Sequence, residues 1–330
     1  MSHQMPDEET VRTVLDRACR APSLHNSQPW RWRWDGMTLG LYVDAERLLP
    51  ATDAFNRQGI LACGGLLDHA RVAWAVAGWS VRVTCLPEPP DRTHLASFTF
   101  RERREPLEAD ELLAAAIDTR YTDRSPLAPP DAWEELEPVL RHVCAHRDTH
   151  LSILDEQHRT ELDRISRTTA HLRRYDPRYQ AELVWWAGTG AYAEAGVPSS
   201  SLPSSDVSAR VPVGRRFPVG GAGVHGGVLG NDHARVVVLS SRDDTVESVL
   251  ACGAALSAVL LECTAEGMST CALTHVTELP SARAMISDLA GDRHPQVLIR
   301  IGRTVTPPPP HTPRREIGEV FEVVSGPRRR

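Results

Sequence analysis

The chain has 330 residues, of which 37 are basic and 43 acidic, so its formal net charge is -6. Its hydrophobic (41%) and charged (24%) fractions are typical of a soluble globular protein and exclude disordered, collagen-like and membrane-spanning classes. Every basic residue is an arginine, because the sequence contains no lysine. This excludes a phosphate-binding P-loop and a pyridoxal Schiff base, both of which need a lysine. A net negative chain without a basic stripe also indicates no nucleic-acid partner.

The cysteines and the first residues indicate a cytoplasmic protein. The seven cysteines include no C-x-x-C pair and are expected to be reduced thiols. The segment MSHQMPDEETVRT is polar and lacks the apolar stretch of a secretory signal. No run of 18 apolar residues occurs, so we expect no membrane association.

In chain order, helical and strand patterns alternate from the start. Residues 8–20 predict a helix, and 30–44 predict two strands joined at Asp35-Gly36, a strong hairpin signal. A long apolar helix around 61–78 is followed by strands at 79–86 and 95–100. Further helices are predicted at 108–118, 131–145, 156–174 and 177–187, followed by a buried strand at 234–241, a second long apolar helix and a strand at 296–302. The chain is therefore predicted to be an α+β protein.

One segment occurs twice. LACGGLLDHARVAWAVAGWS (61–80) aligns without gaps to LACGAALSAVLLECTAEGMS (250–269), with 7 identities in 20 positions. Both copies are apolar helices that end at a glycine, Gly78 or Gly267, and continue into a strand. We therefore predict two related halves fused in one chain as a pseudo-dimer, 1–107 and 108–330.

Residues 188–231 form a long insertion in which 20 of 44 residues are glycine, proline or serine. A loop of this length is either functional or unstructured, and its place inside a domain favours a lid. Within it, Gly221, Gly223 and Gly226 match G-x-G-x-x-G, but no helix can follow, so a dinucleotide fingerprint is not expected.

Two further patterns bear on metal or hydrolytic chemistry. The histidines at 142, 146 and 150, near Cys144, could place two imidazoles on one helix face, but no second ligand cluster is near in sequence. We interpret them as a solvated helix end and expect no metal. Neither H-E-x-x-H nor G-x-S-x-G occurs.

The most informative segment is A-P-S-L-H-N-S-Q-P-W, residues 21–30. Ser23, Asn26 and Gln28 offer hydrogen-bond donors and acceptors on one turn, as a planar heteroaromatic ligand with amide-like edges requires. The alternative is a turn whose polar groups satisfy one another.

This segment resembles the A-P-S-x-x-N-x-Q-P-W signature of the FMN-dependent nitroreductase family at every fixed position. AIDTRYTDRSPL (116–127) resembles the family's Arg-x-Ser/Thr-x-Arg turn, MSTCALTH (268–275) resembles its strand after the repeat helix, and Arg314-Arg315 resembles its basic pair. The layout of two halves with a long insertion is similar to the Acg-type nitroreductase-like proteins of actinobacteria.

The resemblance implies a nitroreductase-like fold and one FMN per chain, because only one set of motifs is complete. The cofactor-binding residues that it implies are Pro22, Ser23, Asn26, Gln28, Pro29, Trp30, Arg31, Trp32, Arg120, Thr122, Arg124, Ala272, Leu273, Thr274, Arg314 and Arg315. The arginines are expected to bind the phosphate, and the backbone of Thr274 is expected to lie near the flavin N5, with no catalytic side chain. Arg101, Arg103 and Arg104 are either a degenerate second phosphate site or, as we prefer, a solvated charge run.

The expected activity is reduction of a nitro compound or another electron-poor small-molecule acceptor by NAD(P)H, in a monomer. One departure bears on this activity: where the family has Pro-Ile-Glu-Gly, this chain has Ala272, Leu273, Thr274 and His275, so a carboxylate is missing. The alternatives are an FMN storage or sequestration protein with a closed lid and little turnover, and a pseudo-enzyme that has lost flavin.

Overall fold

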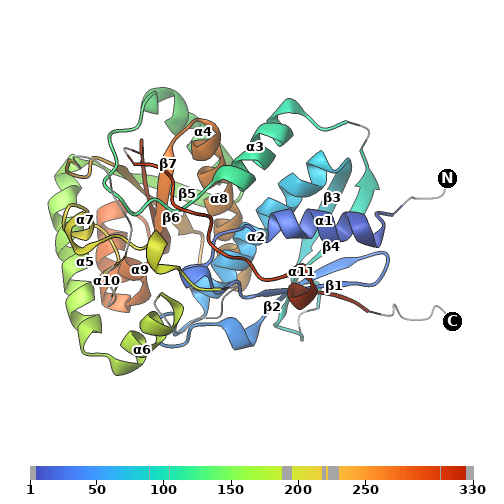
Figure 1. Ribbon diagram of the computed structural model, residues 1–330, viewed down its shortest axis with the longest axis horizontal. Helices are drawn as coiled ribbons and strands as arrows, with labels where there is room; N and C mark the ends of the chain where they lie inside the picture. Colours follow the sequence, from blue (N-terminus) through green and yellow to red (C-terminus); the bar gives the residue numbers. More distant parts are fainter. Residues whose placement is uncertain are drawn as a thin grey trace.

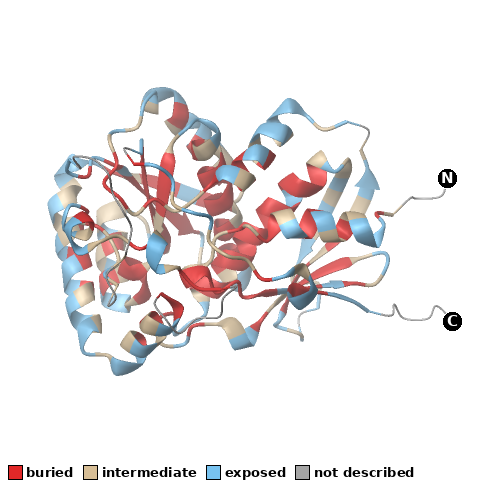
Figure 2. Ribbon diagram, viewed as in Figure 1, coloured by how far each residue is buried: buried red, intermediate tan, exposed pale blue. Residues whose placement is uncertain are grey.

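The computed structural model describes residues 5–88, 90–103, 105–187, 195–217, 221, 230–304 and 306–324. It has an α+β fold, as predicted, with one mixed and one antiparallel sheet separated by two long central helices (Figure 1). The buried residues concentrate on these helices and on the faces of the sheets that they cover (Figure 2). The core therefore runs through the middle of the molecule.

The first sheet has the strand order β3-β4-β2-β1-β9. Its elements are α1 (Glu8–Ala18), β1 (Trp30–Trp34), β2 (Leu39–Val43), α2 (Arg57–Val76), β3 (Trp79–Cys85), β4 (His94–Glu102) and, from the other end of the chain, β9 (Phe321–Val323). The predicted hairpin is confirmed: Asp35 Oδ1 accepts hydrogen bonds from the amides of Met37 and Thr38, and Gly36 has φ 90°. β9 pairs with β1 in parallel, which the sequence did not indicate.

The second sheet has the strand order β5-β6-β8-β7. Its strands are β5 (Thr149–Leu154), β6 (Arg235–Ser241), β7 (Ser269–Leu273) and β8 (Pro295–Gly302). The helices are α3 (Glu108–Thr119), α4 (Trp133–Ala145), α5 (Arg159–Arg174), α6 (Pro177–Trp186), α7 (Ser205–Ala209), α8 (Val246–Ala265), α9 (His275–Glu278), α10 (Pro280–Ala290) and α11 (Ile317–Val320). The four helices predicted between 108 and 187 are confirmed, with small shifts at their ends.

The two sheets have the same connectivity around their long helices. In each, a pair of antiparallel strands precedes the long helix, another pair follows it, and the second strand of each pair lies inside the sheet. Each inner pairing is also interrupted at the same place. The register shifts between Leu41 and Tyr42 on β2 and between Leu239 and Ser240 on β6, so each time one residue of the partner strand is skipped.

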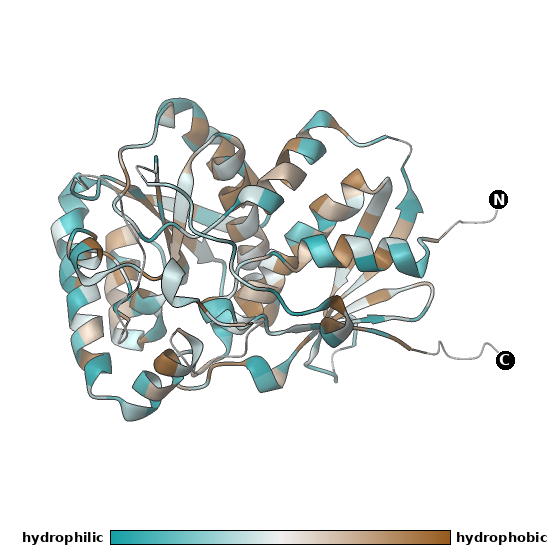
Figure 3. Cartoon of the chain, in the orientation of Figure 1, coloured by the Kyte–Doolittle hydropathy of each residue, from teal (hydrophilic) through white to brown (hydrophobic). Residues whose placement is uncertain are grey.

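The central helices α2 and α8 touch through reciprocal glycines. A Cβ built on Gly64 would lie 2.1 Å from the carbonyl oxygen of Leu250, and one on Gly253 would lie 2.1 Å from that of Leu61. Only glycine permits this separation of the two backbones. α8 is long and apolar enough to cross a membrane, but 72% of that stretch is buried inside the fold. Figure 3 shows α8 as largely hydrophobic, while the peripheral α5 carries many hydrophilic positions.

The C-terminal segment returns from the second sheet to the first. It passes beside the turn at residues 21–30 and ends in α11 and β9, where the Val324 amide donates to the Trp34 carbonyl at 2.8 Å (Figure 1). The boundary at 107 remains a prediction, and the tail of the second predicted half completes the sheet of the first.

Candidate functional site

The turn between α1 and β1 has an unusual backbone. His25, Asn26 and Gln28 have φ values of 51°, 56° and 52°, in the left-handed region that non-glycine residues rarely occupy. Ser23 Oγ accepts a hydrogen bond from the Gln28 amide at 2.9 Å, which holds the turn closed. Clustered strain of this kind costs free energy and is typical of binding sites.

The two amide side chains of the turn attach other segments to it. Asn26 Nδ2 donates to the carbonyls of Gly196 in the insertion, at 3.0 Å, and Pro313 in the C-terminal segment, at 2.9 Å. Gln28 Oε1 accepts from the Arg315 amide at 2.9 Å. Three distant parts of the chain therefore meet at this turn, and these polar groups are satisfied within the protein.

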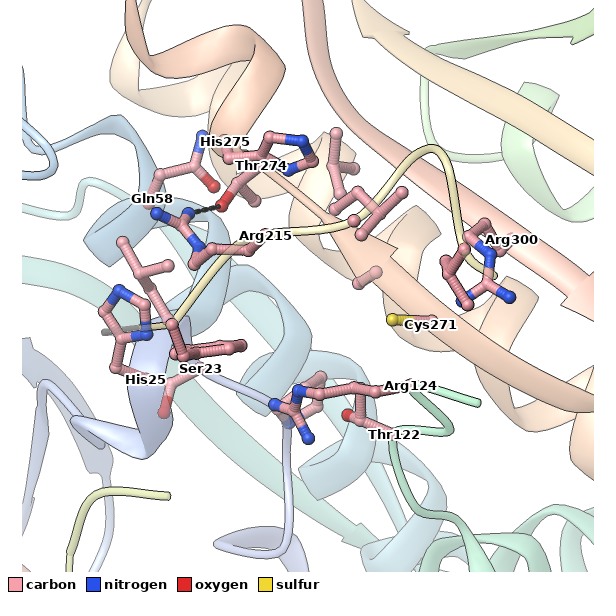
Figure 4. A pocket seen from close by; sticks show the side chains of 18 of the residues that line it. Ser23, His25, Gln58, Thr122, Arg124, Arg215, Cys271, Thr274, His275 and Arg300 are labelled. Carbon is pink, nitrogen blue, oxygen red and sulfur yellow. Dashed lines mark hydrogen bonds between the residues drawn. The ribbon is translucent and has the colours of Figure 1, made fainter. Parts of the chain in front are cut away.

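One cavity, here called the central pocket, lies beside this turn and has about 1020 Å³ of empty space, part of it open to solvent (Figure 4). It is lined by residues of the turn (22–25), α2 (58, 61, 62), the segment after α3 (122, 124), the insertion (203, 208, 211, 214–217), α8 (256), β7 and α9 (271–275) and β8 (297, 300). Thus the turn, the insertion and the strand at 269–273 face one cavity, although they are far apart in sequence.

A second cavity, here called the arginine pocket, continues from the first and shares Pro22, Ser23, Thr122 and Arg124 with it. Its lining includes four arginines and, among the described residues, no carboxylate. These arginines are Arg20, Arg120, Arg124 and Arg314. The pairing of a roomy, largely apolar cavity with a compact cationic one suits a ligand with a flat body and an anionic end.

The electrostatics of the arginine pocket favour an anion. Burial and the nearby Arg20 lower the pKa of Arg120 to about 10, and burial with Arg120 and Arg20 lowers the pKa of Arg314 to about 9. Both effects disfavour the charged guanidinium, and an anion between the groups would offset both. Arg120 Nε is also buried and has no hydrogen-bond partner among the described residues. Arg314, in contrast, is fixed by the carbonyls of Cys19 (3.0 Å) and Arg20 (2.9 Å).

Not all residues of the sequence prediction reach these cavities. Arg315 lies 3.4 Å from Asp44 and 3.4 Å from Glu319, and Arg31 lies 3.0 Å from Asp44, so both belong to an ion-pair network behind the turn. Trp30 and Trp32 are fully buried in the core of the first sheet, and Gln28 and Pro29 are absent from the lining of either cavity. The other predicted residues (Pro22, Ser23, Asn26, Arg120, Thr122, Arg124, Ala272, Leu273, Thr274 and Arg314) line one or both.

A buried ion pair joins the insertion to α9. Arg215 pairs with Glu278 and also donates to the Tyr179 hydroxyl at 2.8 Å and to Thr274 Oγ1 at 3.1 Å. Thr274 Oγ1 in turn donates to Glu278 Oε1 at 3.2 Å. Glu278, four residues after Thr274, is thus a buried carboxylate near the site, but it pairs with Arg215 and does not line either cavity. Sequence reasoning missed both Arg215 and Glu278, because only the fold brings them together.

Two neutral imidazoles also line the central pocket. Burial, then the charges of Arg215 and Arg124, hold the pKa of His25 well below its ordinary value, and burial with Arg215 lowers the pKa of His275 to about 3. His275 Nε2 shares a hydrogen bond of 2.9 Å with Ser166 Oγ. His25 Nε2 and His275 Nδ1 are buried without a partner in the described part of the chain. Each can bind a ligand as a neutral donor or acceptor.

The remaining candidates do not gather into a site. Among the described residues no three His, Cys, Asp or Glu side chains are placed to hold a metal ion. The rings of His142, on α4, and His146, which caps it, are tilted by 47° with centroids 4.2 Å apart. Gly223 and Gly226 lie outside the described residues, as does Arg104, while Arg103 pairs with Asp110 at 2.8 Å.

Comparison with known proteins gives a consistent result, although no family model matches the chain. A Mycobacterium tuberculosis protein named "Putative NAD(P)H nitroreductase acg" is 43% identical over 326 residues, which are 98% of each chain. Another protein of the same organism, also named a putative NAD(P)H nitroreductase, is 38% identical and covers 98% of this chain and 94% of its own. A crystal structure of a putative nitroreductase from Anabaena variabilis superposes with a TM-score of 0.51 over 91% of this chain and 90% of that chain. At 8% identity this last match shows a shared fold.

Proposed function

The chain belongs to the Acg-type nitroreductase family, and from this membership and the site we propose that it is an FMN-dependent oxidoreductase that reduces nitro compounds or other electron-poor acceptors with NAD(P)H. The observation that carries the proposal is the arginine pocket. Its buried guanidinium groups face no carboxylate among the described residues, and the pocket opens into a cavity large enough for a planar ring system.

The residues present fit FMN. Arg20, Arg120 and Arg314 would bind the phosphate, since charge-assisted bonds from several arginines suit a dianion. The orphaned Arg120 Nε is one donor that such a phosphate would satisfy. Ser23, Thr122 and Arg124, at the junction of the cavities, would contact the ribityl chain. The ring system would lie in the central pocket against β7.

When bound, FMN would supply the hydride chemistry, so the protein's task is positioning and electrostatics. The backbone at 272–274, at the end of β7, lines one wall of the central pocket and offers amide groups to the ring. His25 and His275 offer neutral polar groups to an acceptor. The described part of the insertion, held by the ion pair of Arg215 and Glu278, forms one wall of the cavity and would limit the access of water to the reaction.

We further propose that the fold is an internally duplicated pseudo-dimer with one complete site. Apart from β9, the two sheets have matching strand orders, and this match, the similar register shifts and the reciprocal glycines of α2 and α8 support duplication. The second half has no counterpart of the turn at residues 21–30. In the first half, residues 19–29 connect α1 to β1, whereas in the second half only residues 146–148 connect the corresponding elements, α4 and β5. One FMN per monomeric chain follows.

The proposal also covers the cellular compartment. All seven cysteines are free and six of them are buried, which suits a reducing cytoplasm.

The test is the absorbance spectrum of the purified, FMN-reconstituted protein before and after anaerobic addition of NADPH or NADH. We expect a flavin spectrum with one FMN per chain, bleached by at least one of the two nucleotides and restored by a nitroaromatic acceptor. Failure to retain FMN after reconstitution would overturn the proposal.

One observation favours a second candidate, FMN sequestration. Several residues between 203 and 217 of the insertion line the central pocket, and the buried contacts of Arg215 anchor this segment to α9, so the insertion forms part of the cavity wall. Under this alternative, dithionite reduces the bound flavin but neither nicotinamide nucleotide does. Turnover above about 1 per second, within the usual enzyme range, would instead favour the reductase.

A further inference from the structure

A third cavity, here called the basic groove, adjoins the central pocket. It lies between α5, α6 and the insertion, encloses about 930 Å³ of empty space, and shares Arg215, Arg216, Phe217 and His275 with the central pocket. Five arginines and, among the described residues, no carboxylate line it: Arg167, Arg173, Arg174, Arg215 and Arg216. A ligand of the groove would therefore be anionic and could extend to the flavin site.

Three polar atoms of residues that line the groove lack partners in the described part of the chain. They are Thr169 Oγ1, Arg173 Nε and His275 Nδ1, and all three atoms are buried. Thr169 and His275 are only 2% and 4% exposed. The Arg173 guanidinium is fixed by bonds to the backbone carbonyls of residues 51 (3.1 Å) and 52 (3.3 Å), which leaves Nε unused. Buried polar groups are nearly always paired, so this set is typical of a site built for acceptor oxygens.

The charge balance of the groove is positive. Arg167 is neutralised by Asp163 at 2.7 Å, Arg173 by Asp176 at 3.2 Å, and Arg215 by Glu278. Arg174 lies over the Tyr175 ring, and neither it nor the exposed Arg216 pairs with a carboxylate in the described ranges. Two cations at the mouth of a groove with unused donors suit a dianionic phosphate.

We propose, resting on the reductase function above, that the basic groove binds the 2′-phosphate of NADPH and makes this nucleotide, not NADH, the electron donor. A nicotinamide dinucleotide is an extended anion whose nicotinamide ring must reach the flavin in the central pocket. Residues 215–217 and 275 line both cavities, so the groove adjoins the central pocket at the side where the other end of the dinucleotide would extend. The 2′-phosphate is the group that distinguishes NADPH from NADH, and arginine is the residue that accommodates it in other dinucleotide sites.

The test is calorimetric titration of the FMN-loaded protein with 2′,5′-ADP, which carries the 2′-phosphate, and with ADP, which does not. We expect 2′,5′-ADP to bind at least tenfold more tightly. Arg174→Ala and Arg216→Ala should each weaken 2′,5′-ADP binding about tenfold, the loss of one charge-assisted contact. Arg164→Ala is the matched control, because Arg164 is on the same helix, pairs with Glu161 and does not line the groove. Arg174→Ala and Arg164→Ala, which lie outside the central pocket, should keep their FMN.

Each other outcome overturns the groove assignment: no binding of 2′,5′-ADP below 1 mM, equal binding of the two nucleotides, or equal losses in the control and the groove variants. Anaerobic flavin reduction then separates the two proposals. If 2′,5′-ADP binds through Arg174 and Arg216 but no nucleotide reduces the flavin, the groove assignment holds and the reductase function fails. If NADH and NADPH reduce it equally in all variants, the reductase function holds and the groove assignment fails.

Discussion

Ser257 donates a hydrogen bond of 2.8 Å to Asp68, its counterpart in the other copy of the repeated helix, 189 residues away in the chain. His69 joins this contact through Nδ1, 2.8 Å from Ser257 Oγ, and Arg147 lies 2.7 Å from Asp68. In a symmetric dimer, identical side chains would meet at such a position. A fused chain can instead place a donor opposite an acceptor at the centre of the interface.

Making this position identical in both copies should be costly. We expect Ser257→Asp to lower the free energy of unfolding by about 3 kcal/mol, because it buries a second carboxylate beside Asp68. Ser257→Ala removes the hydrogen bonds to Asp68 and His69 without adding a charge and should cost less, about 1 to 2 kcal/mol. Urea unfolding of the two variants provides the measurement, and equal losses would contradict the account of this contact.

The close approach of α2 and α8 should require a glycine at position 64 but not at position 65. Gly64→Ala places a methyl group 2.1 Å from the Leu250 carbonyl oxygen, so the helices must separate, at a cost of about 3 kcal/mol in the free energy of unfolding. In Gly65→Ala the nearest contact is the Gly253 carbonyl oxygen at 3.6 Å, so the gain in helix propensity should leave stability unchanged or slightly raised. A similar loss in both variants would argue against a specific close approach.

Arg120 should contribute strongly to FMN affinity. Arg120→Ala removes one charged partner of the phosphate, and we expect a loss of about 2 to 3 kcal/mol, roughly 30- to 150-fold in Kd, measured by flavin fluorescence. The exposed Arg242, which pairs with Asp243 at 3.5 Å, provides the control Arg242→Ala. Riboflavin lacks the phosphate, so its weaker binding should not respond to either change. An unchanged Kd for FMN would remove Arg120 from the site.

The ion pair of the insertion should set the rate at which flavin leaves. In Arg215→Ala the insertion loses its contacts to Glu278, Tyr179 and Thr274, so we expect FMN to dissociate at least tenfold faster while the phosphate contacts persist. The rate is measured by mixing the FMN-loaded protein, in a stopped-flow instrument, with an excess of a flavin-binding apoprotein that captures the released FMN. Release at the wild-type rate would mean that the insertion does not close the site.

Asp53 should change the free energy of unfolding with pH in the opposite direction to an ordinary surface carboxylate. Burial raises the pKa of Asp53 from 3.8 to about 6, against the lowering effect of the amides of Gly59 and Gln58. Because the folded state holds this proton more tightly than the unfolded state, its stabilising contribution is lost as the pH rises from about 4 to above 6. The variant Asp53→Asn lacks this titration. As the pH rises from about 4 to above 6, its free energy of unfolding should therefore increase by about 3 kcal/mol relative to that of the wild type.

A surface carboxylate serves as the control for that titration. The Thr10 hydroxyl and amide lower the pKa of the exposed Asp7, so the stabilising contribution of Asp7 is lost as the pH falls. The difference between Asp7→Asn and wild type should thus move in the opposite direction. Parallel profiles for the two variants would contradict the assignment for Asp53.

Local patterns predicted most of the secondary structure. The hairpin at Asp35-Gly36 and the glycine-terminated repeat helices are set by turn chemistry and by apolar periodicity, which are readable over a few residues. The parallel pairing of β9 with β1 could not be predicted, because Phe321–Val323 is three residues long and acquires its partner from the other end of the chain. No local signal encodes such a pairing.

The candidate site could likewise be predicted from the sequence only where local motifs encode it. Ser23, Arg120 and Arg124 belong to short motifs, and the structure brings them to adjoining cavities. Arg314 and Arg315 are adjacent in sequence, yet only Arg314 lines the arginine pocket, because the backbone turns Arg315 toward Asp44 and Glu319. Arg215 and Glu278 carry no motif, and their pairing depends on how the insertion crosses α9.

The strand β9 also bears on how the protein is made. Arg33 on β1 pairs with Glu322 on β9, 289 residues later, and Arg314 precedes that strand by only a few positions. Translation proceeds from the N-terminus at about 5–20 residues per second, so β1 is made long before β9. The edge of β1 that pairs with β9 therefore stays unpaired until the C-terminal segment has been made. Under the proposed function, flavin capture requires the segment that carries Arg314 and therefore follows its synthesis. A nascent chain stalled before residue 314 would have its sheet edge exposed and its anion site incomplete, and would offer quality-control proteases a clear distinction between unfinished and mature molecules.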